Sequence, residues 1–263
     1  MTESVRFDRA AEYYDRTRAA DPRAMAEVLE QLRAESVGRG RCLEIGVGTG
    51  ILALALAERG IPMVGVDLSA PMLSKLLDKA GGRAPFPLTL ADATSLPFED
   101  GSFGVALGRW VLHLIPGWEQ VVDELVRVVR PGGVVLLNLG GFRRIWSIVD
   151  RFLDAAGGIP FAVGLDPREP EQLDTAFARH GAEVRLLPPI PSRDETTIGE
   201  FLEEMRTGLH SWTWRVPDEV REQAVPAVRA WAEHEFGSLD EPVEPEVDIG
   251  WRAYDLPRPD GIL

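Results

Sequence analysis

The chain has 263 residues, of which 45% are hydrophobic, so it can bury a full core as one α/β domain with an elaboration. Its formal net charge of −14 opposes binding to nucleic-acid phosphates, and its single cysteine, Cys42, excludes an internal disulfide. No apolar run approaches the ~20 residues that span a bilayer, and no uninterrupted apolar segment begins the chain, so we expect a cytoplasmic protein without a membrane partner.

The apolar periodicity predicts two leading helices, over residues 4 to about 19 and 22–35. Strands and helices then alternate, with strands expected at 41–45, 62–67, 88–91, 103–108 and 133–139, and helices at 50–58, 71–80 and 117–129. Further helices are expected at 143–156 and 169–180, and further strands at 182–187 and 247–254. This order indicates an α/β, doubly wound, mostly parallel seven-stranded sheet, with a ligand beyond the carboxyl ends of the strands.

A long insert interrupts the alternation before the last strand, and we interpret it as a helical cap with two helices. The expected organisation has three parts. N-terminal helices in 1–36 cover the ligand site, a core occupies 37–189 and 246–263, and the cap occupies 190–245.

The segment Leu43-Glu44-Ile45-Gly46-Val47-Gly48-Thr49-Gly50 places three alternate glycines between a predicted strand and a predicted helix. Glycine there permits a positive φ and a close approach of backbone to ligand. The alternatives are an ordinary glycine-rich turn and a dinucleotide site, although the dinucleotide fingerprint G-x-G-x-x-G is one residue longer.

Three carboxylates narrow the class of ligand that this loop can bind. Asp67 ends the second strand, 21 positions after Gly46, where an acid can accept hydrogen bonds from both ribose hydroxyls. Asp92 ends the third strand and can accept from the exocyclic amine of adenine. Glu44 would repel a pyrophosphate but suits a cationic ligand, so the pattern favours an adenosine-like ligand other than NAD.

Four motifs follow one another along the chain, and the glycine segment is the first. The others are Val66-Asp67-Leu68-Ser69 with Met72, Asp92-Ala93 before Leu96-Pro97-Phe98, and Arg130-Pro131-Gly132-Gly133. Over roughly residues 7–140 the chain resembles the class I S-adenosylmethionine-dependent methyltransferases. Within them it is similar to the ubiquinone/menaquinone-type group that acts on small molecules. The resemblance implies a Rossmann-like fold and S-adenosyl-L-methionine as cofactor.

The resemblance also implies roles for individual residues. Asp67 would hold the ribose, Leu68 and Met72 would flank the adenine, and Asp92 would contact its amine, next to Ala93. Glu44 supports the loop or faces the ligand's ammonium. The remaining expected cofactor contacts are Tyr14, Arg18, Gly46, Val47, Gly48, Gly50, Gly108 and Arg109.

Candidate substrate and catalytic residues follow the fourth strand or lie in the insert. His113 is either a general base or a structural residue packed at the turn after the strand. Trp110 either lines the substrate pocket or belongs to the hydrophobic core. Arg109 binds a carboxylate of the substrate or the cofactor, or forms a salt bridge. In the insert, the candidates for stacking on a flat or cationic substrate, or for anchoring the cap, are His210, Trp212 and Trp214. The four histidines show no metal-ligand spacing, so no metal is expected.

The leading functional hypothesis is transfer of a methyl group from S-adenosylmethionine to a small-molecule acceptor, by in-line displacement with positioning and desolvation. A second hypothesis keeps the cofactor but uses it for chemistry other than methyl transfer. A third is an NAD-dependent oxidoreductase. The acceptor, the atom that is methylated and the oligomeric state are not specified by the sequence.

Overall fold

The computed structural model describes residues 3–17, 21–140, 145–193, 195–243 and 246–258. The chain forms two compact units, one of residues 1–140, 164–190 and 249–263, the other of residues 141–163 and 191–248. Residues 141–163 thus group with the insert, whereas we expected them in the core. In the described ranges, no helix combines the length and apolar character needed to cross a membrane.

The first unit begins with η1 (Asp8–Ala10), α1 (Tyr14–Thr17) and α2 (Pro22–Ser36). Strands and helices then alternate through β1 (Cys42–Ile45), α3 (Ile51–Glu58), β2 (Met63–Asp67), α4 (Ala70–Lys79), β3 (Leu88–Leu90), β4 (Phe103–Arg109), η2 (Leu112–Leu114), α5 (Trp118–Val128) and β5 (Val129–Asn138). The unit is completed by α7 (Pro170–Ala178), β6 (Glu183–Leu186) and β9 (Arg252–Asp255).

Seven strands of the described chain form one sheet in the order β3-β2-β1-β4-β5-β9-β6. The first five are parallel neighbours, and β9 runs antiparallel to both β5 and β6. The structure therefore confirms the mostly parallel, doubly wound sheet. The strand order reverses between β1 and β4, and at such a switch point ligands bind outside the carboxyl ends of the strands.

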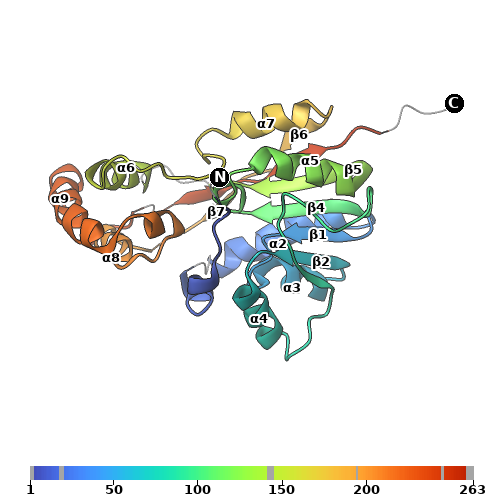
Figure 1. The fold of residues 1–263 in the computed structure, drawn as a ribbon, viewed down its shortest axis with the longest axis horizontal. Helices are drawn as coiled ribbons and strands as arrows, with labels where there is room; N and C mark the ends of the chain where they lie inside the picture. Colours follow the sequence, from blue (N-terminus) through green and yellow to red (C-terminus); the bar gives the residue numbers. More distant parts are fainter. Residues whose placement is uncertain (1–2, 18–20, 141–144, 194, 244–245, 259–263) are drawn as a thin grey trace. The chain divides into compact units, whose positions relative to one another are not determined.

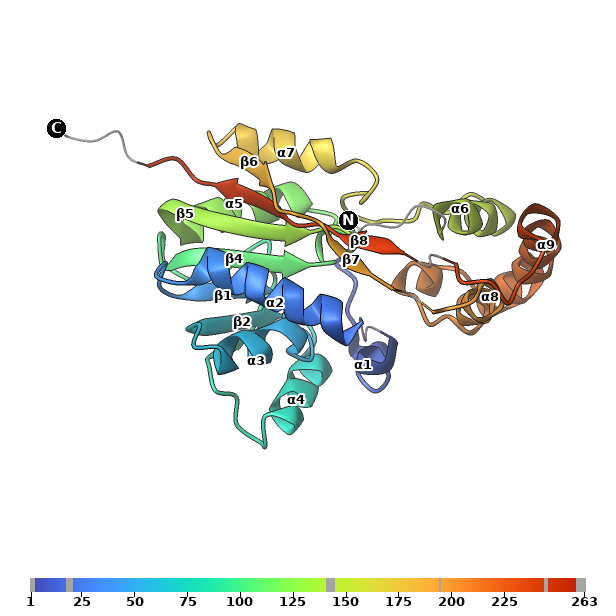
Figure 2. The same cartoon turned by 180° about the vertical axis from the view of Figure 1, so that it is seen from behind.

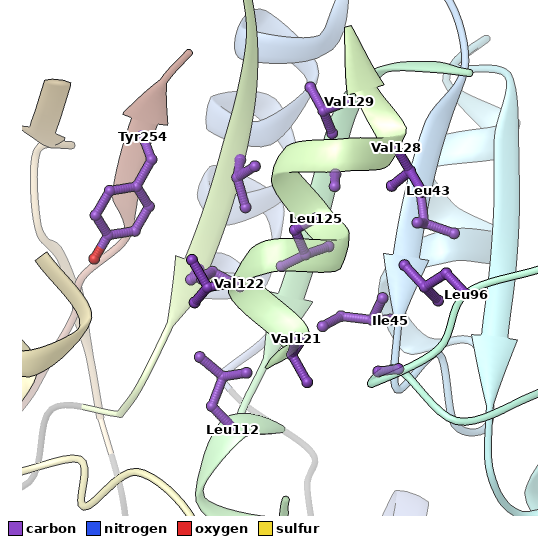
Figure 3. Close-up of a cluster of buried hydrophobic side chains, with 14 of the residues drawn as sticks. Leu43, Ile45, Leu96, Leu112, Val121, Val122, Leu125, Val128, Val129 and Tyr254 are labelled. Carbon is purple, nitrogen blue, oxygen red and sulfur yellow. The ribbon is translucent and has the colours of Figure 1, made fainter. Parts of the chain in front are cut away.

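The central strands β1 and β4 are buried on both faces, which is why their sequences are nearly continuous apolar runs. Leu43 and Ile45 of β1 face a core cluster with α5 and α7, whereas Cys42 faces a second cluster with α2 and α3. Figures 1 and 2 show α5 and α2 on opposite faces of the sheet. Figure 3 shows how Val121, Leu125 and other side chains of α5 pack over the strands.

Two predicted elements are wrong in extent. The predicted helix over residues 4 to about 19 is broken, because residues 3–7 form no helix and the chain turns between η1 and α1; residues 18–20 lie outside the described part. The predicted strand over 247–254 is two strands, separated at Gly250 and Trp251. The first, β8 (Val247–Ile249), pairs with β7 (Ile190–Ser192) in a separate sheet, and β9 joins the large one.

The second unit contains α6 (Ile145–Ala155), α8 (Ile198–Thr207), η3 (Ser211–Arg215) and α9 (Asp218–Phe236), packed around their own apolar cluster. Thr197 and Glu200 form a capping box at the start of α8. The guanidinium of Arg221, which is only 5% exposed, donates to the Val216 carbonyl at 2.6 Å and to Asp218 at 2.7 Å. These bonds fix the segment between α8 and α9, where His210, Trp212 and Trp214 lie.

Candidate functional site

The glycine loop after β1 has the conformation that its residues predict. Gly46 has a φ of 63° and Gly48 a φ of 54°, both in the left-handed region that side chains rarely adopt. A Cβ on Gly46 would lie 2.8 Å from Cγ2 of Val111, and one on Gly48 would lie 3.2 Å from Cε of Met72. Glycine is thus needed here both for the turn and for the close approach of neighbouring side chains.

Asp67 joins this loop to the start of α4. Its Oδ2 accepts from the backbone N–H of Gly48 at 2.7 Å, and its Oδ1 accepts from the N–H of Ser69 at 2.8 Å. Burial raises the pKa of the Asp67 carboxyl above its ordinary value, while these N–H groups act to lower it. The carboxylate is therefore fixed in orientation at the carboxyl end of β2, beside the loop.

Asp92 lies after β3, in a loop that α5 fastens to the core. Its Oδ1 accepts from both the N–H and the hydroxyl of Thr94, at 2.9 and 2.8 Å. Downstream, Glu124 accepts from the Leu96 N–H at 2.6 Å, and Arg127 donates to the Leu96 carbonyl at 3.0 Å. Arg127 and Glu124 also pair with each other at 2.7 Å, so this ion pair holds the loop that carries Asp92.

Glu44 is a buried acid beneath the loop, with only 4% of its surface exposed. Burial raises the pKa of its carboxyl well above the ordinary value of 4.5; Arg109 acts to lower that pKa, and Asp67 raises it further. Its Oε2 has no hydrogen-bond partner among the residues that the structure describes. A buried polar atom without a partner is costly, so it indicates a place where a ligand can contribute a donor.

The raised pKa of Glu44 has a consequence for stability. Because the folded protein holds this proton more tightly than the unfolded chain, the free energy of unfolding falls as pH rises from about 4.5 through the folded-state pKa. Glu44→Gln removes this titration, so the variant-minus-wild-type difference should grow with pH by up to about 1.4 kcal/mol per unit. Urea unfolding from pH 5 to 8 measures it, with the exposed Glu58→Gln as control. Parallel curves for Glu44→Gln and wild type would show that Glu44 is not perturbed.

Trp110 follows β4. Its φ is 53°, and no other non-glycine residue in the described part of the chain has a positive φ. The backbone N–H of Trp110 donates to the Asn138 carbonyl at 2.9 Å, and the guanidinium of Arg109 lies 4.3 Å from the centroid of the Trp110 ring. A bulky side chain in this region is unusual and is held there by its surroundings, as is often the case at functional sites.

These elements surround one pocket of the first unit, with a volume of about 680 Å³ including its open mouth. The lining comes from the glycine loop, the ends of β2, β3 and β4, the segment around η2 and the N-terminal segment. The lining residues are Ser4, Val5, Arg6, Phe7, Tyr14, Gly46, Gly48, Val66, Asp67, Leu68, Met72, Ala91, Asp92, Ala93, Arg109, Trp110, Val111, Leu114 and Ile115.

The structure brings most of the predicted site residues together and leaves some apart. The lining contains Tyr14, Gly46, Gly48, Asp67, Leu68, Met72, Asp92, Ala93, Arg109 and Trp110. The predicted residues outside that lining are Glu44, Val47, Gly50, Gly108 and His113, and Arg18 lies outside the described residues. His113 lies on η2, with an electrostatic interaction with Asp166, and its role as a base stays a prediction.

The three candidate substrate-contacting residues of the insert, His210, Trp212 and Trp214, belong to the second unit. Trp212 is 8% exposed and packs edge-on against Phe152, while the indole N–H of Trp214 donates to the Gly208 carbonyl at 2.9 Å. His210 contacts Glu204 through Nε2 at 3.0 Å. These contacts give all three side chains a structural role within that unit, and their role toward a substrate stays a prediction.

Sequence reasoning missed the pocket residues that precede η1. Ser4, Val5 and Phe7 line the pocket because the Val5 N–H donates to the Leu114 carbonyl at 3.0 Å. This pairing joins residues 109 positions apart, and no local motif encodes it. The apolar character of Leu114 and Ile115 after β4 was the available signal for the facing wall.

The pocket fits an adenosine-containing cation. A glycine turn with positive φ, a carboxylate at the end of β2 and another after β3 lie at the switch point of a parallel sheet. Glu44, whose buried Oε2 has no partner in the described structure, lies outside this lining. The fold and the site thus define a nucleoside-binding α/β domain that suits S-adenosylmethionine.

Comparison with known proteins supports this assignment of the fold and the site. A methyltransferase domain family matches residues 43–137. Demethylmenaquinone methyltransferase of Thermus thermophilus is 34% identical over 166 residues, which cover 55% of this chain and 75% of that protein. An uncharacterized methyltransferase of a Mycobacterium species is 39% identical over 122 residues, 46% of this chain and 47% of that protein. The chain spans about half the length of this and several other curated relatives.

Among solved structures, a methyltransferase of an antibiotic biosynthesis pathway in Anabaena variabilis superposes with a TM-score of 0.62 at 17% identity. The superposition covers 91% of this chain and 99% of that one, and it supports the fold alone. The chain belongs to the class I S-adenosylmethionine-dependent methyltransferases, with S-adenosylmethionine as its cofactor.

Proposed function

We propose that this protein transfers a methyl group from S-adenosylmethionine to a small-molecule acceptor. The observation that carries the proposal is that the glycine loop, Asp67 and Asp92 line the same pocket as Arg109 and Trp110. The cofactor, when bound, supplies an activated methyl group on a sulfonium. A cytoplasmic location and the exclusion of nucleic acid as a substrate stay part of this proposal.

The chain's own residues would act mainly by binding and orientation. Asp67, already fixed by the N–H groups of Gly48 and Ser69, would accept from the ribose hydroxyls, and Asp92 would accept from the adenine amine. Glu44, which lies outside the pocket lining, would support the glycine loop or face the ammonium group. In-line displacement needs alignment of the acceptor and exclusion of water, and Trp110 and Phe7 supply apolar surface for both.

The proposal is tested by incubating the protein with S-adenosylmethionine and a panel of acceptors. Demethylmenaquinone and malonyl-acyl-carrier protein are the first probes, because relatives are methyltransferases of these two kinds. Formation of S-adenosylhomocysteine with a methylated product supports the proposal. Consumption of an acceptor without S-adenosylhomocysteine would replace it with chemistry other than methyl transfer, and oxidation of NADH by the protein would favour an oxidoreductase.

A further inference from the structure

The N-terminal segment, residues 4–17, supplies five of the residues that line the cofactor pocket, Ser4, Val5, Arg6, Phe7 and Tyr14. A Cβ on Gly48 would lie 4.0 Å from Cε1 of Tyr14, so this ring lies beside the glycine loop. Phe7 packs edge-on against Tyr14, with 5.8 Å between ring centroids. The segment therefore forms one wall of the pocket. The contacts that hold this segment in place also determine how the pocket closes.

Asp15 is the side chain of this segment that contacts both the glycine loop and α4. Its Oδ1 accepts from the hydroxyl of Thr49 at 2.5 Å, and Thr49 belongs to the glycine loop. Its Oδ2 accepts from Nζ of Lys79 at 2.9 Å, and Lys79 is the last residue of α4, the helix that carries Met72. One carboxylate thus connects the N-terminal wall both to the glycine loop and to α4.

The Thr49 contact makes this connection more than a surface ion pair. Thr49 is 1% exposed, and its hydroxyl donates to Asp15. If Asp15 moved away, a buried hydroxyl would lose a charged acceptor, which costs more than breaking an exposed pair. The neighbouring pair between Glu12 and Lys75, at 2.8 Å, lacks such a contact, and its carboxylate side chain is 79% exposed against 46% for Asp15.

We propose that Asp15 is a positioning residue that holds residues 4–17 closed against the cofactor pocket and so sets cofactor affinity and the rate of product release. This inference rests on the proposed function, because it assigns the ligand of the pocket. A segment that is already ordered need not be ordered by the ligand, so the contact raises affinity through preorganisation. Loss of the contact should act chiefly on dissociation, since opening of the wall precedes escape.

The test uses the full chain with Asp15→Ala and Asp15→Asn, and Glu12→Ala as the matched control from the same segment. Titration calorimetry should show binding of S-adenosylmethionine and S-adenosylhomocysteine weakened about tenfold by Asp15→Ala, the effect of losing one charge-assisted bond. Asp15→Asn keeps an acceptor for Thr49 and should be intermediate. Glu12→Ala should change affinity less than about twofold, as exposed pairs do.

A second readout separates positioning from general stability. In the ligand-free protein, amide hydrogen exchange over residues 4–17 should be faster in Asp15→Ala than in Glu12→Ala, while the melting temperature stays close to that of the wild type. Equal affinity losses in the two alanine variants, or unchanged affinity and exchange in Asp15→Ala, would overturn the inference. If the wild type bound neither ligand, the proposed function would fail, and the exchange measurement would still decide whether Asp15 holds the segment.

Discussion

Asp67→Ala is expected to weaken binding of S-adenosylmethionine at least about 100-fold, since two hydrogen bonds to a charged acceptor contribute about 3 kcal/mol together. The variant removes the proposed acceptor for the ribose hydroxyls. It also releases the N–H groups of Gly48 and Ser69, which the carboxylate now holds at 2.7 and 2.8 Å. Loss of the ligand contact and loss of loop order therefore act in the same direction.

Calorimetric titration of the purified variant measures this effect. Asp78→Asn is the control for the change of one negative charge, because Asp78 is an exposed residue of α4 outside the pocket lining. It should bind the cofactor like the wild type. If Asp67→Ala retained the affinity of the wild type, Asp67 would not contact the ribose, and the assignment of the pocket would have to change.

Gly46→Ala is expected to have the second large effect, on both stability and binding. A side chain at a φ of 63° is strained by about 1–2 kcal/mol. The added Cβ would lie 2.8 Å from Cγ2 of Val111, so either the loop or Val111 must move. Since both line the pocket, we expect cofactor affinity to fall by more than about tenfold, the change that 1.4 kcal/mol produces.

Gly60→Ala is a matched control for the backbone strain. Gly60 also has a positive φ, 80°, but a Cβ there would meet nothing within 4 Å. This variant should lose stability through strain alone and keep its affinity for S-adenosylmethionine. Urea unfolding and calorimetry measure the two quantities separately. Similar affinities in the two variants would show that the packing of Val111 against the loop is irrelevant to the site.

The sequence predicted those parts of the fold and site that depend on local patterns. The apolar run Cys42–Ile45, the positive-φ glycines and the helix-forming run after them are contiguous, so the strand, turn and helix could be assigned together. Asp67 and Asp92 could be placed because Asp67 ends β2 and Asp92 follows β3, and the carboxyl ends of parallel strands meet at one edge.

The parts that were missed depend on contacts between distant segments. The apolar spacing of residues 4–19 is compatible with a helix, yet the Val5 N–H donates to the distant Leu114 carbonyl and residues 3–7 form no helix. The alternation over 247–254 is compatible with one strand, and its break into β8 and β9 is set by two different sheets. Tyr14-Asp15 resembles the Tyr-Asp element of the family, yet the sequence assigns no partner to Asp15, and its contacts with Thr49 and Lys79 appear only in the structure.

The most direct test of the account is a calorimetric titration of the wild-type protein with S-adenosylmethionine, S-adenosylhomocysteine and NADH. We expect one site for each of the first two ligands, with micromolar dissociation constants, competition between them, and no binding of NADH. The absence of heat with both S-adenosyl ligands, or displacement of either by NADH, would contradict the assignment of the pocket formed by the glycine loop, Asp67 and Asp92.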